Sequence, residues 1–249
     1  MERDPEILAL ILGGSLAHGF AREDSDVDIL ILVSPEVLER HRSTGRLHYN
    51  NRSLCTYPGY IDGKFLDAGF LYRVAERGSD AARYAFKDAR ILFSRLDGLN
   101  DLLCAAARYP IAHQADRVTR FGAQLLAWRW YYSEAVRQQS PYLACLAVQR
   151  VVLFSTRLVL TLNAALFPYH KWMLRVLESV PHRPSDMIAR IDQLLQPQRP
   201  AWETVDRYCR DMLAFAGIDF DKADSCWPTH FMRDTELRWM NEEPAIEDL

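Results

Sequence analysis

Two short groups of residues near the start of the chain have types and spacing that suit phosphate chemistry. Gly13, Gly14 and Ser15 follow one apolar run, and Asp26 and Asp28 open a second. Glycines let a ligand approach the backbone closely, and a serine where a helix begins adds a hydroxyl to N–H groups that favour anions. Two carboxylates separated by one residue on a strand point to the same side, where they could hold a divalent cation. A phosphate cradle beside metal-binding carboxylates predicts an attack on a nucleoside triphosphate.

Each motif alone has a structural explanation, in which Ser15 caps a helix and the two aspartates cap a turn. Their order, with each motif tied to its own strand, favours the functional interpretation. Arg22 and Ser25 lie between the motifs, close enough in sequence to contact phosphates or to brace the aspartates. We therefore include both as candidate nucleotide-binding residues.

Orienting an attacking hydroxyl calls for a third acidic group. The segment 64–71 has strand character with Asp67 in its middle, so Asp67 could lie beside Asp26 and Asp28 on a neighbouring strand. Asp62 is the competing candidate, but Asp62-Gly63 is typical of a tight turn, where an aspartate caps. We predict Asp67 as the third carboxylate.

These motifs resemble the nucleotidyltransferase superfamily typified by DNA polymerase β and the kanamycin nucleotidyltransferase. The matching residues are Gly13, Gly14, Ser15, Asp26, Asp28 and, less completely, Asp67. The resemblance covers roughly the first 110 residues, and its motifs specify the superfamily but not the substrate.

The resemblance implies transfer of a nucleoside monophosphate to a hydroxyl, with pyrophosphate leaving. By position, Asp26 and Asp28 would ligate two Mg²⁺ ions, which Mn²⁺ could replace. Asp67 would ligate the catalytic ion and help to activate the acceptor. Ser15 and the backbone of Gly14 would contact the triphosphate.

The elements that must position these residues can be read from the apolar runs. Residues 7–12 and 27–33 are short continuous apolar runs, which predict strands buried on both faces. A helix is expected over 74–88, and Pro110 marks a plausible boundary. The resemblance implies an α/β (α+β) palm with a mixed sheet. We expect a nucleotidyltransferase domain over 1–110 and an all-α helical bundle over 111–249.

The period of apolar residues changes to that of helices in the second half of the chain. Long helices are expected over 114–139 and 142–166, and further helices between 172 and 216. The segment from Asp219 is expected to be irregular, with 242–249 acidic and frayed. A palm followed by a bundle is similar to antibiotic nucleotidyltransferases, which implies that the acceptor binds between the two domains.

The helix over 142–166 is apolar enough to suggest a membrane span. Arg150 and Arg157 interrupt it, and each would cost roughly 2.5–3.5 kcal/mol at a bilayer centre. With Thr161 they share one helical stripe. We expect a bundle helix with one polar edge, and no membrane.

The segment 167–172 looks like a phenylalanine-proline-aromatic-x-lysine-tryptophan element of the bundles in some small nucleotidyltransferase-like proteins. Lys171 follows the helix-ending Pro168, so its point charge could turn toward the triphosphate. The alternative is a solvated lysine beside a packed tryptophan. We include Lys171 among the candidate nucleotide-binding residues.

Composition limits the partners and the compartment. The chain has 249 residues and a formal net charge of −3, which argues against a nucleic-acid substrate, for which a basic surface is expected. Five scattered cysteines suggest neither a disulfide framework nor a zinc site. The charged first five residues do not fit a signal peptide, so we expect a cytoplasmic protein. The sequence leaves the oligomeric state open.

The leading hypothesis is an enzyme that moves AMP from ATP to a hydroxyl of a small molecule such as an antibiotic. Two alternatives stay open. One is an adenylyltransferase that acts on a protein, as in antitoxins, although those proteins resemble the first domain alone. The other is a non-catalytic interaction module with the same fold, against which the intact acidic residues argue.

Overall fold

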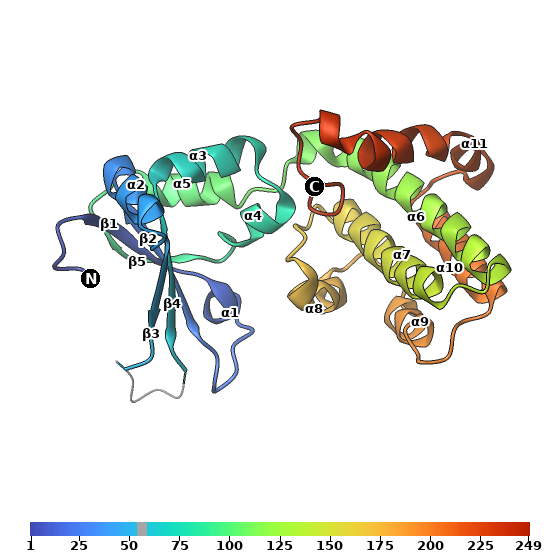
Figure 1. Cartoon of the computed structure of the whole chain (residues 1–249), viewed down its shortest axis with the longest axis horizontal. Helices are drawn as coiled ribbons and strands as arrows, with labels where there is room; N and C mark the ends of the chain where they lie inside the picture. Colours follow the sequence, from blue (N-terminus) through green and yellow to red (C-terminus); the bar gives the residue numbers. More distant parts are fainter. Residues whose placement is uncertain (54–58) are drawn as a thin grey trace. The chain divides into compact units, whose positions relative to one another are not determined.

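The computed structural model describes residues 1–53 and 59–249, so that Cys55 lies outside the described residues. The contacts divide the chain into two compact units, Met1–Arg108 and Tyr109–Leu249. Figure 1 traces the first unit in blue to green and the second in green to red.

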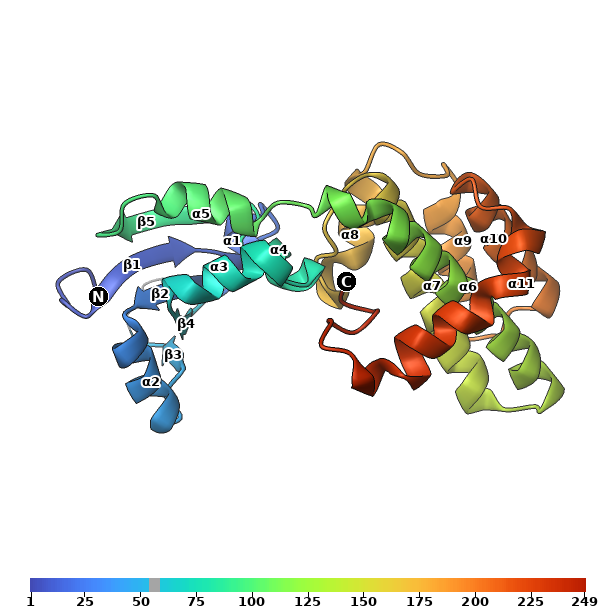
Figure 2. The same ribbon diagram turned by 90° about the horizontal axis from the view of Figure 1, so that it is seen from above.

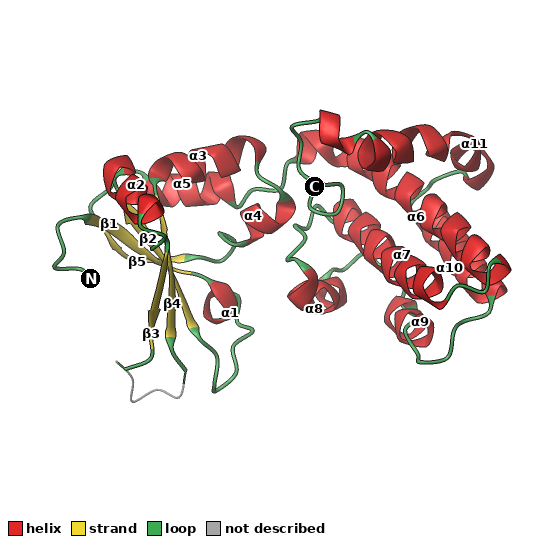
Figure 3. Ribbon diagram, viewed as in Figure 1, coloured by secondary structure: helices red, strands yellow, loops and turns green. Residues whose placement is uncertain are grey.

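The first unit is built on a mixed five-stranded sheet with strand order β3-β4-β2-β1-β5. The strands are β1 (Ile7–Leu12), β2 (Val27–Val33), β3 (His48–Asn51), β4 (Ile61–Leu66) and β5 (Arg90–Ser94). Strands β2 and β4 are parallel, and the other three pairs are antiparallel. Figure 3 shows this sheet in yellow among the helices of the unit. The mixed sheet followed by helices confirms the predicted fold class.

Both faces of the sheet are covered, which explains why its central strands are continuously apolar. On one face lie α3 (Ala68–Arg77) and α5 (Leu99–Ala106), whose Leu71, Val74 and Leu103 pack with Leu32 and Leu66 of the sheet. Figure 2 shows α3 and α5 side by side. On the other face, α2 (Pro35–Ser43) contributes Leu38 to a second cluster. Consequently β1 and β2 have the bounds that the sequence predicted.

Two predicted elements of the first unit are wrong. The predicted strand over 64–71 ends at Leu66, because Asp67 caps α3 and its Oδ1 accepts a hydrogen bond of 2.7 Å from the backbone N–H of Phe70. The predicted helix over 74–88 is two helices, α3 and α4 (Asp80–Tyr84). They separate at Gly78, where a Cβ would lie 2.7 Å from the carbonyl oxygen of Val74.

The second unit is helical. Its α-helices are α6 (Gln114–Arg137), α7 (Pro141–Leu162), α8 (Met173–Ser179), α9 (Met187–Leu194), α10 (Trp202–Phe215) and α11 (Phe220–Phe231). Helices α6 and α7 form an extensive pair, and α11 and α10 also pack on α6. Short 3₁₀ segments precede α6 and α8, and a π-helical turn over Met232–Glu236 follows α11.

Helix α7 is long and apolar enough to cross a membrane by length and composition, and 72% of its most apolar window is buried inside the protein. The sequence predicted one polar edge on this helix. Instead Arg157 and Thr161 are buried, and only Arg150 of the stripe is partly exposed. The Arg157 guanidinium lies 4.8 Å from the ring centre of Phe121 and 4.3 Å from that of Phe167. Flat aromatic faces can receive a guanidinium, so the stripe lies inside the bundle.

The segment after residue 219 is more ordered than its sequence predicted. Asp219 caps α11 by accepting a hydrogen bond of 2.9 Å from the N–H of Lys222. Further on, Ile246 and Leu249 are buried, and Glu243 pairs with Arg120 at 3.1 Å. The expectation of an irregular segment is therefore wrong for 220–240, whereas 241–249 has no helix or strand but packs through Ile246 and Leu249. Local composition does not reveal these long-range contacts.

Candidate active site

The Gly13-Gly14 turn connects β1 to the four-residue helix α1 (Gly14–Ala17) and lies against Asp28. The N–H of Gly13 donates a hydrogen bond of 3.0 Å to the carbonyl oxygen of Asp28. Gly14 has φ +61°, and a Cβ there would lie 1.8 Å from Asp28 Oδ2. Both its backbone conformation and its lack of a side chain are therefore required. The structure thus brings the glycine turn and Asp28 together, as the sequence suggested.

Ser15 is the first side chain of this turn and it is 6% exposed. Its hydroxyl accepts and donates no hydrogen bond within residues 1–53 and 59–249. A buried hydroxyl without a partner costs about 1–3 kcal/mol. The first N–H groups of a helix also lack intrahelical partners. Ser15 and the start of α1 therefore offer donors that an anionic oxygen could satisfy.

Asp28 has a carboxylate neighbour on the next strand. Strands β2 and β4 are parallel, and their register places Asp28 directly beside Asp62. In-register residues of neighbouring strands point to the same face, with backbones about 4.8 Å apart. Asp26 lies immediately before β2, where the N–H of Val27 donates to the carbonyl of Tyr60 at 2.8 Å. The acidic pair is therefore Asp28 with Asp62, and Asp26 stands at the same end of the sheet.

Asp67 does not lie beside Asp26 and Asp28, and this predicted placement is wrong. It lies one residue beyond the end of β4 and five residues after Asp62, which separates it from Asp28 by about 16 Å along the sheet. Besides capping α3, it lies 3.6 Å from Arg73. Its carboxylate is thus occupied at the opposite end of the sheet.

The sequence carried a signal for Asp62 that its neighbouring glycine obscured. Both Asp28 and Asp62 are the second residue of their strands, and Asp62 alternates with Ile61 and Gly63. Gly63 is typical of a turn but here permits close packing, since a Cβ would lie 3.0 Å from a methyl group of Ile31. Asp62 also contacts Nε2 of His48 on the edge strand β3. A glycine within a strand marks such close approaches as well as turns.

A histidine–aspartate pair borders the same region. The side chain of His18, which ends α1, is 4% exposed, and its Nδ1 lies 3.4 Å from Asp88 Oδ2. Its ring packs against Tyr84, with centres 4.6 Å apart. Burial lowers the pKa of His18, against the opposing influence of Asp88 and of Asp28. His18 is therefore neutral at physiological pH.

The other candidate nucleotide-binding residues have only local contacts among those described. Arg22 is exposed in the loop between α1 and β2, with its Nε 3.3 Å from Asp24. Its backbone N–H donates to Ser25 Oγ at 2.8 Å, so Ser25 stabilises the loop before Asp26. Lys171 belongs to the second unit and is exposed, with its Nζ 5.0 Å from the ring centre of Trp172. These three roles remain predictions.

In the described part of the chain, no three His, Cys, Asp or Glu side chains converge closely enough to hold a metal ion. The donor set nevertheless fits Mg²⁺, which commonly takes one or two carboxylates and completes its shell with phosphate and water oxygens. Asp28 and Asp62 supply two carboxylates on one face, and Gly14, because it has no side chain, makes room for the Asp28 carboxylate against the turn. Asp28 and Asp62 are therefore the residues that would hold a cation, and the Gly13-Gly14 turn lies beside them.

Comparisons with known proteins relate the first part of the chain to a family. Residues 1–69 match the model of the nucleotidyltransferase domain family, which supports the predicted superfamily for this part of the chain. Among solved structures, the chain is similar to a nucleotidyltransferase-like protein from Exiguobacterium sibiricum 255-15 at 16% sequence identity. That comparison covers 93% of this chain and 76% of the other, with a TM-score of 0.48. No curated protein matches the chain.

Proposed function

We propose that this chain, whose residues 1–69 carry a nucleotidyltransferase domain, transfers AMP from ATP to a hydroxyl of a small-molecule acceptor. The observation that supports this function best is the juxtaposition of the Gly14 cradle with Asp28 and its neighbour Asp62. Hydrogen-bond donors that suit a phosphate group lie there beside carboxylates, at one end of the sheet. An interaction module would not need a buried, unsatisfied hydroxyl beside clustered acids.

In the first unit, the hydrogen-bond donors would contact the triphosphate and the carboxylates would hold the cations. The Ser15 hydroxyl and the N–H groups that begin α1 would hydrogen-bond to triphosphate oxygens, which fixes the direction of the leaving pyrophosphate. Gly14, which has no side chain, lets the Asp28 carboxylate lie against the turn, so a phosphate held by the turn would be next to that acid. These contacts position the α-phosphorus for in-line attack.

The acids would hold the cations and orient the acceptor. Asp28 and Asp62 are the pair that would ligate Mg²⁺, and Asp26, at the same end of the sheet, would join them once an ion is bound. Asp62 takes the role that the sequence assigned to Asp67. When bound, the ions neutralise phosphate charge and lower the pKa of a coordinated hydroxyl. Asp62, one of whose oxygens contacts the imidazole of His48, would accept a hydrogen bond from the acceptor hydroxyl through its other oxygen.

Pyrophosphate release tests this proposal. Purified protein is incubated with Mg²⁺, each of four nucleoside triphosphates and a panel of aminoglycosides, lincosamides and simpler polyols. We expect release with ATP and at least one acceptor, and loss of release in Asp28→Asn. Mass spectrometry of the acceptor should show an added AMP.

A measurement of Mg²⁺ binding distinguishes a panel that lacks the right acceptor from a protein that has no metal site. At a Mg²⁺ concentration about ten times its Kd, the free energy of unfolding should rise by roughly 1.4 kcal/mol. Asp26→Ala should abolish this gain, and should be neutral or stabilising without metal because like charges crowd there. An equal gain in both proteins, together with no turnover of any nucleotide, would favour the non-catalytic module.

A further inference from the structure

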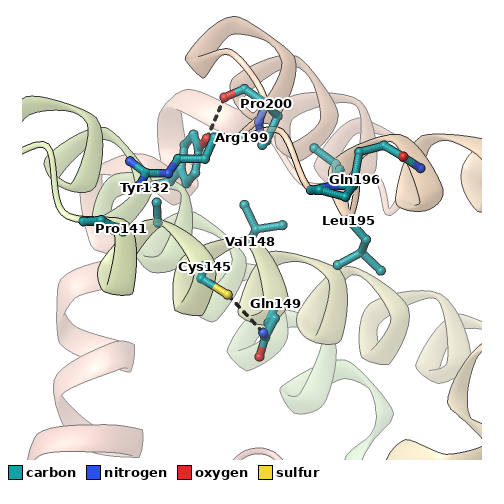
Figure 4. Close-up of a pocket in the computed structure, with 12 residues that line it drawn as sticks. Tyr132, Pro141, Cys145, Val148, Gln149, Leu195, Gln196, Arg199 and Pro200 are labelled. Carbon is teal, nitrogen blue, oxygen red and sulfur yellow. Dashed lines mark hydrogen bonds between the residues drawn. The ribbon is translucent and has the colours of Figure 1, made fainter.

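A cavity in the second unit is lined by residues that have no part in the proposed nucleotide site. Its volume is about 230 Å³, and three segments line it: α6 near its end, the first turns of α7, and the segment between α9 and α10. Figure 4 shows these walls, with Cys145, Val148 and Gln149 on α7 and Leu195 and Gln196 opposite. The cavity is smaller than the roughly 300–1,000 Å³ that drug-sized ligands occupy. A ligand of few heavy atoms would fit it.

The segment that closes the cavity is held in place. Tyr132 donates a hydrogen bond of 2.6 Å from its hydroxyl to the carbonyl oxygen of Pro200. Pro197 and Pro200 have restricted φ, so the segment between them has few alternative conformations. Leu194 is buried beneath it, while Leu195 is 46% exposed at the wall. The cavity is therefore preformed, and a ligand would not have to order the chain on binding.

One charge stands in this otherwise neutral cavity. Arg199 makes no hydrogen bond or ion pair with any residue in the described ranges, and none of the residues that line the cavity is acidic. Burial raises the pKa of Tyr132, so its phenol stays neutral and no phenolate competes for Arg199. Arg199 is exposed to solvent as well as lining the cavity, so its guanidinium is available to an anion that enters.

The other residues that line the cavity indicate which uncharged groups a ligand would carry. Pro141, Ala144, Val148, Leu195 and Pro197 present hydrocarbon, whereas Gln149 donates from Nε2 to Cys145 Sγ at 3.3 Å and so turns one of its donors away. A planar guanidinium matches a carboxylate through two parallel hydrogen bonds. We propose that this cavity binds a small carboxylic acid with an apolar body, held by Arg199 at the charged end.

The test uses hexanoate, hexanol and inorganic phosphate with the full chain. Isothermal titration should show hexanoate binding and much weaker binding of the other two, since only hexanoate has both the charge and the hydrocarbon. Arg199→Gln should weaken hexanoate binding about tenfold or more, because charge-assisted hydrogen bonds are lost. Arg207→Gln is the matched control, since Arg207 is also an exposed arginine of this unit but does not line the cavity.

Cys145 reports binding at the site itself. It is a free, exposed cysteine in the cavity wall, whereas the equally free and exposed Cys226 lies on α11 outside it. Hexanoate should slow alkylation of Cys145 by iodoacetamide and leave the rate at Cys226 unchanged, as followed by mass spectrometry of the two peptides. Equal affinity for hexanol, unchanged affinity in Arg199→Gln with an unaltered melting temperature, or no protection of Cys145 would each overturn the proposal. Binding of phosphate alone would also overturn it, because the apolar walls would then have no role.

Discussion

Asp62 and Asp67 are five residues apart, yet the fold places them in different surroundings. Asp62 lies in register with Asp28, and Asp67 caps α3. We predict that Asp62→Asn lowers the rate of pyrophosphate release at least about 100-fold, because a ligand charge is lost. Asp67→Asn should leave the rate within about twofold, since asparagine caps a helix as well as aspartate does.

This pair of variants is a matched test, because both replacements remove one charge and keep the shape. Steady-state kinetics with a saturating acceptor measures the two rates, and thermal melting confirms that both proteins fold. If Asp67→Asn were as inactive as Asp62→Asn, the register argument for the third carboxylate would be wrong.

Ser15 gives a prediction in which stability and affinity change in opposite directions. Its hydroxyl is buried without a partner in the described structure, so Ser15→Ala should leave the ligand-free protein as stable or raise its stability by up to about 1 kcal/mol. The same variant should weaken ATP binding several-fold. Urea unfolding and equilibrium binding measure the two effects. A variant that is clearly less stable, with unchanged ATP affinity, would show that Ser15 is only a packing residue.

His18 makes stability depend on pH with a definite sign. Burial lowers its pKa in the folded state, so the unfolded chain binds the proton more readily. The stability from neutral His18 is therefore present above its ordinary pKa of 6.5 and is lost as the pH falls through the lowered value. The stability advantage of wild type over His18→Gln should be smaller at about pH 5.5 than at about pH 7.5. Urea unfolding at both values measures it, and a larger advantage at the lower pH would contradict the assignment.

At the scale of elements, one buried charge cluster joins α6 to the π-helical turn Met232–Glu236. Arg120 on α6 pairs with Asp234 at 3.0 Å, and both are buried. Burial opposes the charge on Arg120, but the hydrogen bond and the charge of Asp234 outweigh it, so the pKa of Arg120 is raised. Each of these two buried charges is therefore stabilised by the other, and neither would be compensated to the same extent alone.

Removing one partner should therefore be costly. Asp234→Ala should lower the free energy of unfolding by about 3–5 kcal/mol, because it leaves Arg120 buried with less compensation. Glu243→Gln is the matched control, since Glu243 pairs with the same arginine but is 58% exposed, and its loss should cost less than about 1 kcal/mol. Equal losses in urea unfolding would show that burial is not the deciding factor.

At the scale of the whole molecule, the last residues contribute to the stability of the chain. Ile246 and Leu249 are buried, and Glu247 pairs with Arg150 of α7. Deleting residues 245–249 should remove roughly 1.5–3 kcal/mol of stability for each buried side chain, as an upper value. Glu247→Gln alone should cost less than about 1 kcal/mol, because this ion pair is partly exposed. If the shortened chain unfolded at the same urea concentration as the full chain, 242–249 would be frayed as its composition suggested.

The sequence alone determined the elements whose signals are local. The continuous apolar runs fixed β1 and β2 because both faces of these strands are buried, and the glycine turn and Asp28 meet because they are joined through neighbouring strands. Helical periodicity likewise located α6 and α7, whose apolar residues face each other.

Only the tertiary structure decided the features that depend on distant partners. Asp62 and Asp67 are both acids near strand-like sequence, and the parallel register of β2 with β4, which no local pattern encodes, selects Asp62. The polar stripe of α7 is turned inward because Phe121 and Phe167 receive Arg157. The segment 242–249 packs because its Glu243 and Glu247 pair with Arg120 and Arg150, which lie more than 90 residues earlier in the chain. Register and long-range pairing are set by the packing free energy of the whole fold, which is why the sequence read locally could not determine them.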